Sequence, residues 1–114
     1  MNYELLKNAG IDTDTALGRF MGNKALLERF LKKFLEDKNF ERLQRAVDEG
    51  DHAAALEASH TLKGVCGNLS LDELYELFSG QVSLMREDRW EEAADMMERI
   101  TAVYDRVTEA IRNA

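Results

Sequence analysis

Residues 58–70 read A-S-H-T-L-K-G-V-C-G-N-L-S, a stretch with helical spacing that nevertheless contains two glycines. A glycine inside a helix costs about 1 kcal/mol relative to alanine. Gly64 comes one turn after His60, which is one of only two histidines in the chain. The stretch therefore indicates a helix in which glycine serves a purpose other than helix stability.

A helical wheel at about 100° per residue separates two faces in the segment 51–69. Five apolar residues lie opposite His60 and predict the side that faces the core: Ala55, Ala58, Leu62, Val65 and Leu69. The face of His60 carries Ala53, Leu56, Gly64 and Gly67, flanked by Glu57 and Lys63. We therefore expect His60 to face solvent on a surface that glycine leaves bare, and Ala53 with Leu56 to form a small apolar docking patch beside it.

The flanking sequence has the apolar spacing of helices and no alternation typical of strands. Short helices are expected over residues 3–8 and about 12–20. Longer ones are expected over residues 23–35, 40–50, 51–69, 71–85 and 88–111. The second of these is either a separate helix or a kinked continuation of the first. Asp12 or Thr13, Asn23, Asp51 and Asp88 are the expected caps, and Ser70 with Glu73 has the spacing of a capping box.

The absence of proline suits long uninterrupted helices, and the loops between the predicted helices are short. These features predict an all-α fold: an antiparallel up-down four-helix bundle, with the short N-terminal helices covering one end. The length of 114 residues predicts a single domain over residues 1–114.

The composition disfavours several classes of function. With 22 acidic and 15 basic side chains, the net charge is -7, which disfavours binding to nucleic acid. The single Cys66 permits no intramolecular disulfide and no thiolate zinc site, and fits a cytoplasmic setting. No segment approaches the roughly 18 apolar residues of a membrane span, so no membrane association is expected.

The residues around His60 favour one kind of chemistry. Much of an exposed imidazole is neutral at pH 7, and the neutral ring is nucleophilic. No serine or cysteine is placed beside it and no catalytic triad is visible. Glu57, a turn before, is either an acceptor for one ring nitrogen or a solvated charge. Lys63, one turn along, supplies a cation that suits an arriving anion, and a phosphoryl group is the obvious candidate.

The stretch H-T-L-K-G-V-C-G-N-L at 60–69 resembles the histidine-containing phosphotransfer (HPt) domain of phosphorelays. The family pattern places a lysine and then a glycine three and four residues after the histidine, with a second small residue a turn later. The segments A-L-G-R-F-M-G-N at 16–23, G-D-H-A-A-A-L-E-A-S-H at 50–60 and D-R-W-E-E-A at 88–93 extend the resemblance over nearly the whole chain. Departures are Cys66, Ser70-Leu71 and Gly80, where the family more often has a small residue, Gly-Ala and a helix former.

The resemblance implies a phosphocarrier rather than an independent enzyme. His60 would accept a phosphoryl group from a receiver-domain aspartate and pass it to another receiver. Lys63 would balance charge, Gly64 and Gly67 would leave room, and Ala53, Leu56 and Glu57 would contact the partner. The receiver would supply Mg²⁺, so the chain needs no cofactor of its own. The implied partners are receiver domains of response regulators and a hybrid sensor histidine kinase, bound by a monomer.

Two alternatives remain at this point. The first is an HPt-like adaptor that binds receivers or kinases without carrying phosphate. The second is a metal-binding bundle that uses His52, His60 and nearby glutamates; the sequence disfavours it because the two histidines lie about 80° apart on the wheel. Replacing His60 separates a carrier from an adaptor, since only the carrier loses its function.

Overall fold

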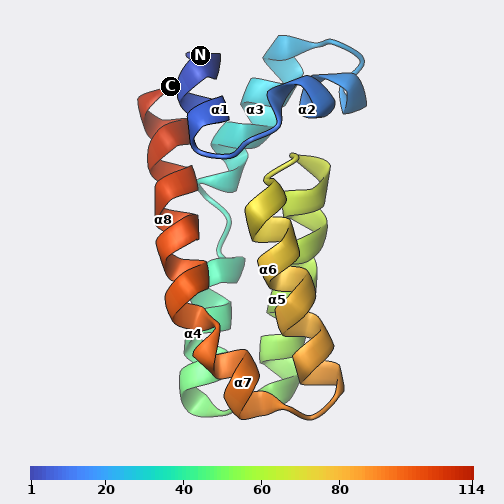
Figure 1. Ribbon diagram of the computed structural model, residues 1–114, viewed down its shortest axis with the longest axis vertical. Coiled ribbons are helices and arrows are strands. Elements are labelled where there is room, and N and C mark those ends of the chain that lie inside the picture. Colours follow the sequence, from blue (N-terminus) through green and yellow to red (C-terminus); the bar gives the residue numbers. More distant parts are fainter.

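The computed structural model describes all residues, 1–114, and its regular structure is helical throughout (Figure 1). An isolated antiparallel bridge between Ile11 and Leu71 is the one extended pairing. The fold is therefore all-α, as the sequence predicts. The eight helices are α1 (Tyr3–Asn8), α2 (Thr13–Arg19), α3 (Lys24–Phe34), α4 (Asn39–Glu49), α5 (His52–Asn68), α6 (Asp72–Arg86), α7 (Trp90–Asp95) and α8 (Met97–Asn113).

Four helices, α4, α5, α6 and α8, run along the long axis in alternating directions and form the bundle (Figure 1). Helix α5 packs between α4 and α6, and α6 also packs against α8. Helices α1, α2 and α3 gather at one end, where both termini lie and the backbone N–H of Asn2 donates to the carbonyl of Ala114 at 2.8 Å. The predicted bundle with N-terminal helices at one end is thus confirmed. No helix is both long and apolar enough to cross a bilayer.

Short polar side chains begin three helices as predicted, whereas Asp88 does not cap α7: it has a left-handed φ of 59°, and the residue before α7 is Arg89. The carboxylate of Asp12 accepts the N–H of Thr15 at 3.1 Å, the amide oxygen of Asn23 accepts that of Leu26 at 3.0 Å, and Asp51 starts α5 in the same way through Ala54. Each cap satisfies a backbone donor that the first helical turn leaves free. These caps therefore fix where α2, α3 and α5 begin.

The predicted capping box at Ser70 is wrong. Ser70 has a left-handed φ of 55°, and its N–H and that of Leu71 donate to the carbonyls of Gly67 and Cys66. This is the Schellman pattern that ends a helix, so Ser70 closes α5 instead of opening α6. Its hydroxyl accepts a hydrogen bond from Arg19 at 2.9 Å, and the carboxylate of Glu73 instead binds two arginines of α8.

The predicted last helix is also interrupted, because α7 ends at Asp95 and α8 begins at Met97. The buried amide of Gln81, on α6, donates to the carbonyl of Ala93 at 3.0 Å beside this break. The oxygen of the same amide accepts the hydroxyl hydrogen of Ser59 at 2.8 Å. A side chain that satisfies a helix carbonyl permits such a break, and here it also joins α5, α6 and α7.

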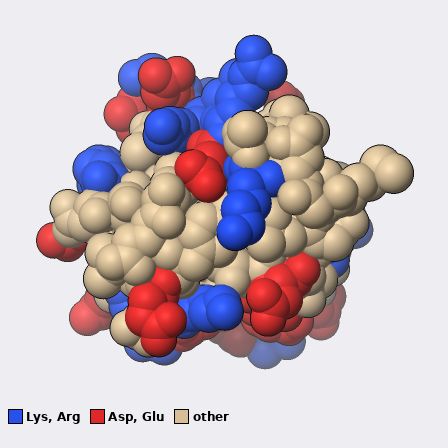
Figure 2. Space-filling model, turned by 90° about the horizontal axis from the view of Figure 1, so that it is seen from above, with Lys and Arg blue, Asp and Glu red and all other residues tan.

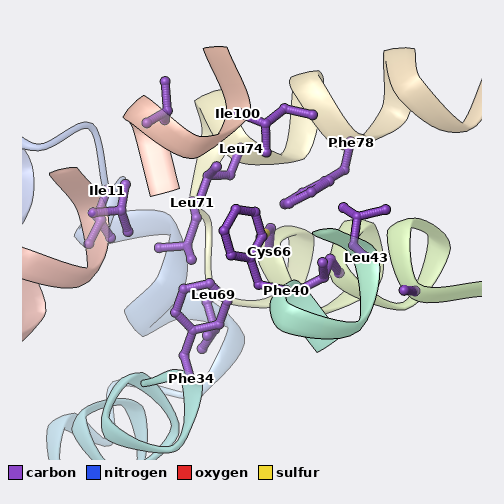
Figure 3. Packing of buried hydrophobic residues seen from close by; sticks show 14 of the residues in the cluster. Ile11, Phe34, Phe40, Leu43, Cys66, Leu69, Leu71, Leu74, Phe78 and Ile100 are labelled. Carbon is purple, nitrogen blue, oxygen red and sulfur yellow. The ribbon is translucent and has the colours of Figure 1, made fainter. Parts of the chain in front are cut away.

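The core lies where the four bundle helices converge, with Cys66, Phe40, Leu43 and Phe78 pointing into it (Figure 3). Of the five predicted core residues, four are buried, and Val65 is half-buried and packs against the core. Ser59 and Cys66 are buried as well. The buried side is rotated by roughly 30° on the wheel because the hydroxyl of Ser59 finds its partner in Gln81.

Candidate functional site

His60 lies near the middle of α5 on its exposed side, across the helix from the buried Ala58 and Leu62. The ring makes no hydrogen bond to another part of the chain, and the hydroxyl of Thr61 instead donates to the carbonyl of Glu57 at 2.9 Å. Both ring nitrogens are therefore open to a group that arrives from outside. The predicted solvent exposure of His60 is confirmed.

The two glycines that follow His60 have different surroundings. A Cβ atom added to Gly64 would meet nothing within 4 Å, so this glycine leaves open space on the face of His60. A Cβ atom on Gly67 would come within 3.0 Å of the ring of Tyr75, on α6. Gly67 thus makes room for a neighbour within the chain, whereas no internal contact accounts for Gly64.

Two charged side chains flank the histidine. Lys63 is half-buried and takes part in no ion pair, so its ammonium group is available to an incoming anion. The carboxylate of Glu57 lies 3.4 Å from the guanidinium of Arg42, on α4. Glu57 is therefore engaged by α4 and does not orient the imidazole. Both partners are exposed, so the ion pair adds little to stability.

The apolar patch beside His60 differs from the prediction. Ala53 is exposed, but Leu56 is half-buried and packs against the core. Tyr75, which the sequence analysis did not single out, is 37% exposed and lies against Gly67. Its place in α6 about 70° from the centre of the apolar stripe was the signal that it borders the surface. The patch on this face is therefore centred more on Tyr75 than on Leu56.

Arg19 was also missed, because 48 residues separate it from its partner. Its guanidinium donates to the carbonyl of Gly67 as well as to the hydroxyl of Ser70. No local sequence pattern predicts such a long-range contact. It ties the end of α2 to the end of α5 and so helps to fix how the N-terminal helices sit at this end of the bundle (Figure 1).

The remaining nucleophilic and metal-binding candidates lie elsewhere. Burial raises the pKa of the Cys66 thiol and the Asp37 carboxylate adds to the shift, so Cys66 stays protonated in the core. His52 stacks on the indole of Trp90, with ring centroids 3.8 Å apart and planes within 3°. No three histidine, cysteine, aspartate or glutamate side chains are grouped so that they could hold a metal ion. His60 is thus the one exposed nucleophile on this face of α5.

The family model of the Hpt domain matches residues 25–110 of the chain. The chain therefore belongs to the Hpt domain family, whose members are phosphotransfer modules of two-component signalling systems and exchange phosphoryl groups with receiver domains and kinases. Searches of curated proteins and of solved structures returned no match.

Proposed function

We propose that this chain is a phosphorelay intermediate, in which His60 accepts a phosphoryl group from a receiver-domain aspartate and passes it to an aspartate of another receiver. The observation that carries the proposal is an exposed imidazole, free of intramolecular partners, on a face that Gly64 leaves open. Membership of the Hpt family supplies the reaction class.

The transfer needs few groups from this chain. A lone pair on an imidazole nitrogen attacks phosphorus, the P–O bond to the aspartate carboxylate breaks, and a P–N bond forms as the carboxylate leaves. The second ring nitrogen keeps its proton. The return transfer reverses these bonds on another carboxylate. Because an acyl phosphate and a phosphoimidazole are both reactive, positioning and charge balance are the main requirements.

The neighbours of His60 fit these two requirements. The ammonium of Lys63, one turn away, would offset the charge of the bound phosphoryl group. The open space at Gly64 would let the receiver's backbone approach the ring. Ala53, Leu56, Glu57 and Gly67 would border the contact with the partner, and Tyr75 adds an exposed aromatic surface of the kind enriched at interfaces.

The receiver would provide the Mg²⁺ and the groups that stabilise the transition state, so the chain would act without a cofactor of its own. It would do so in the cytoplasm. It would act as a monomer, because a second copy that covered α5 would block the approach to His60. The competing proposal is an adaptor that binds the same receivers without taking the phosphoryl group.

Phosphotransfer from receivers labelled at their aspartate tests the proposal. Wild type is compared with His60→Gln, and His52→Gln serves as the matched control because it replaces the other histidine of the same helix. We expect wild type and His52→Gln to take up acid-labile, base-stable label and His60→Gln to take up none. If wild type binds a receiver but no receiver in a broad panel loses label to it, the adaptor is correct.

A further inference from the structure

An open groove of about 880 Å³ lies between α4 and α8. Val47, Ala94 and Met97 form its apolar part, and the carboxylates of Asp48 and Glu98 flank it. Helix α5 packs against α4 and α6. His60 faces outward from α5, so the groove opens on another side of the bundle. A molecule bound there would leave the face of His60 free.

The groove exists because α4 and α8 approach each other at only one level. The rings of Phe40 and Tyr104 stack there, with centroids 3.9 Å apart and planes within 10°. The two helices are antiparallel, so Val47 and Met97 come about two turns farther along the same seam. Both are left half-buried, with one side against the core and the other facing the groove. The α4–α8 seam is thus closed at Phe40 and Tyr104 and open at Val47 and Met97.

Both charged residues that line this groove are acidic, and three arginines of α4 and α8 are paired elsewhere. Arg42 of α4 pairs with Glu57 of α5. Arg99 and Arg106 of α8 both bind Glu73 of α6. These three arginines therefore face α5 or α6. Arg45 of α4 is exposed and unpaired but does not line the groove, where the charged residues are Asp48 and Glu98.

The acidic residues repeat along both flanks. Glu41 lies seven residues before Asp48 on α4, and Asp105 lies seven residues after Glu98 on α8, which puts each pair on one side of its helix. All four are exposed and none takes part in an ion pair. Burial raises the pKa of Tyr104 to about 12, and the nearby Glu41 is among the charges that add to the shift. This places Glu41 near the α4–α8 seam, together with Arg112, whose positive charge lowers the same pKa.

We propose that the α4–α8 groove docks a cationic amphipathic helix of a partner protein. The apolar face of that helix would cover Val47, Ala94 and Met97, and its lysines or arginines would meet Asp48 and Glu98. An apolar channel between acidic flanks is complementary to such a helix. A second copy of this chain is a poorer occupant, because it would bring a further charge of -7 to an acidic surface. The partner could thus hold the domain while His60 exchanges its phosphoryl group.

A designed peptide about four turns long, with leucine at helical spacing and lysine elsewhere, is the probe. Binding to the full chain is followed by backbone amide chemical shifts in NMR. We expect saturable shifts at Val47, Ala94 and Met97 and none at Gly64. A leucine–glutamate peptide with the same leucine spacing should not bind. Shifts that centre on any other part of the surface would overturn the proposal.

Charge reversal locates the site independently. Asp48→Lys/Glu98→Lys should weaken binding of the leucine–lysine peptide by about tenfold or more. The matched control is Glu4→Lys/Glu36→Lys, which changes the net charge equally at exposed carboxylates that do not line the groove. Equal weakening by both pairs would show that the peptide responds only to net charge and would overturn the proposal. Neither pair touches the face of His60, so failure here leaves the proposed phosphotransfer intact.

Discussion

At the scale of single residues, His60 and Gly64 form a pair in which one supplies the reactive nitrogen and the other the access to it. His60 is exposed because it lies across α5 from the buried side, where Ala58 and Leu62 enter the core. Gly64 has no neighbour within 4 Å of its missing Cβ atom. No contact within the chain requires a glycine at this position. A glycine of this kind, on the face of a reactive side chain, indicates a contact made by another molecule.

Replacing each glycine by alanine should separate these roles. Gly64→Ala should stabilise the chain by ~0.5–1 kcal/mol because alanine is the better helix former and finds open space. It should also slow phosphotransfer from a receiver by about tenfold, since the methyl group enters the surface that the partner approaches. Urea unfolding and transfer kinetics measure the two effects, and unchanged kinetics would contradict the role given to Gly64.

Gly67→Ala should gain less stability than Gly64→Ala. Its new methyl group would lie 3.0 Å from the ring of Tyr75, which has to move outward to admit it. The comparison is repeated with Tyr75→Ala in both proteins, where the contact is gone. We expect the two glycine substitutions to become equally stabilising in that background; a persistent difference would mean that Tyr75 is not the constraint.

At the scale of helices, a buried polar chain fixes how α5, α6 and α7 meet. The hydroxyl of Ser59 donates to the amide oxygen of Gln81, and the amide nitrogen of Gln81 donates to the carbonyl of Ala93. Ser59 and Gln81 are fully buried, so the Ser59 hydroxyl and the Gln81 amide oxygen depend on each other for a hydrogen bond. Ser59 directly precedes His60, so the network helps to fix the rotation of α5 about its own axis.

Breaking this network should be costly. Gln81→Met keeps the size of the side chain but leaves the Ser59 hydroxyl and the Ala93 carbonyl without that partner, and should lower the free energy of unfolding by ~2–3 kcal/mol. Ser59→Ala should cost ~1–2 kcal/mol because it removes one partner of the buried amide. In the double variant, the loss of unfolding free energy should be smaller than the sum of the two single losses. Urea unfolding measures all three proteins, and strictly additive losses would show that the residues act separately.

The link between α6 and α8 should depend on pH. Hydrogen bonds from Arg106 and Arg99 hold the pKa of Glu73 below its ordinary value. A carboxyl group whose pKa is lower in the folded state stabilises the fold above its unfolded pKa, near 4.3, and this contribution is lost as pH falls through the folded pKa. The difference in unfolding free energy between wild type and Glu73→Gln should be constant near pH 7 and shrink below about pH 4. A difference that persists at pH 2 would exclude the ion pairs as its source.

Helix starts were predictable from the sequence where one side chain determines them, and turns were not. Asp12, Asn23 and Asp51 cap helices because a short polar side chain reaches a backbone N–H three residues on. Ser70 carries the same local signal, but the Schellman turn and the distant Arg19 determine its conformation. The break at Met96 likewise depends on Gln81, a residue of another helix.

At the scale of the whole molecule, charge is distributed unevenly. Basic and acidic side chains are interspersed on the end that carries α1, α2 and α3 (Figure 2). Asp48 and Glu98 are the only charged residues among those that line the α4–α8 groove. His60 could be identified from a local motif, since helical spacing alone gives its exposure and that of Gly64. The groove could not be identified in this way, because its charge depends on which arginines of α4 and α8 pair with residues of α5 and α6.

The core should keep Cys66 unreactive as long as the bundle is closed. Its thiol is fully buried among residues of several helices, and burial raises its pKa (Figure 3). The native chain should therefore react with a thiol reagent such as Ellman's reagent only through opening of the fold, and immediately in urea. Gln81→Met should speed the native reaction by about tenfold for each 1.4 kcal/mol of stability that it loses. Rapid labelling of the native wild type would contradict the packing described for Cys66.

The central claim is that His60 carries the phosphoryl group, and locating the group on the chain tests it most directly. The chain is incubated with a receiver charged on its aspartate, digested at alkaline pH, and analysed by mass spectrometry of the peptides that contain His52 and His60 separately. We predict one phosphoryl group on the peptide with His60 and none on the peptide with His52. A phosphoryl group on any other residue, or a wild-type chain that stays unmodified beside a charged receiver known to bind it, would contradict the account.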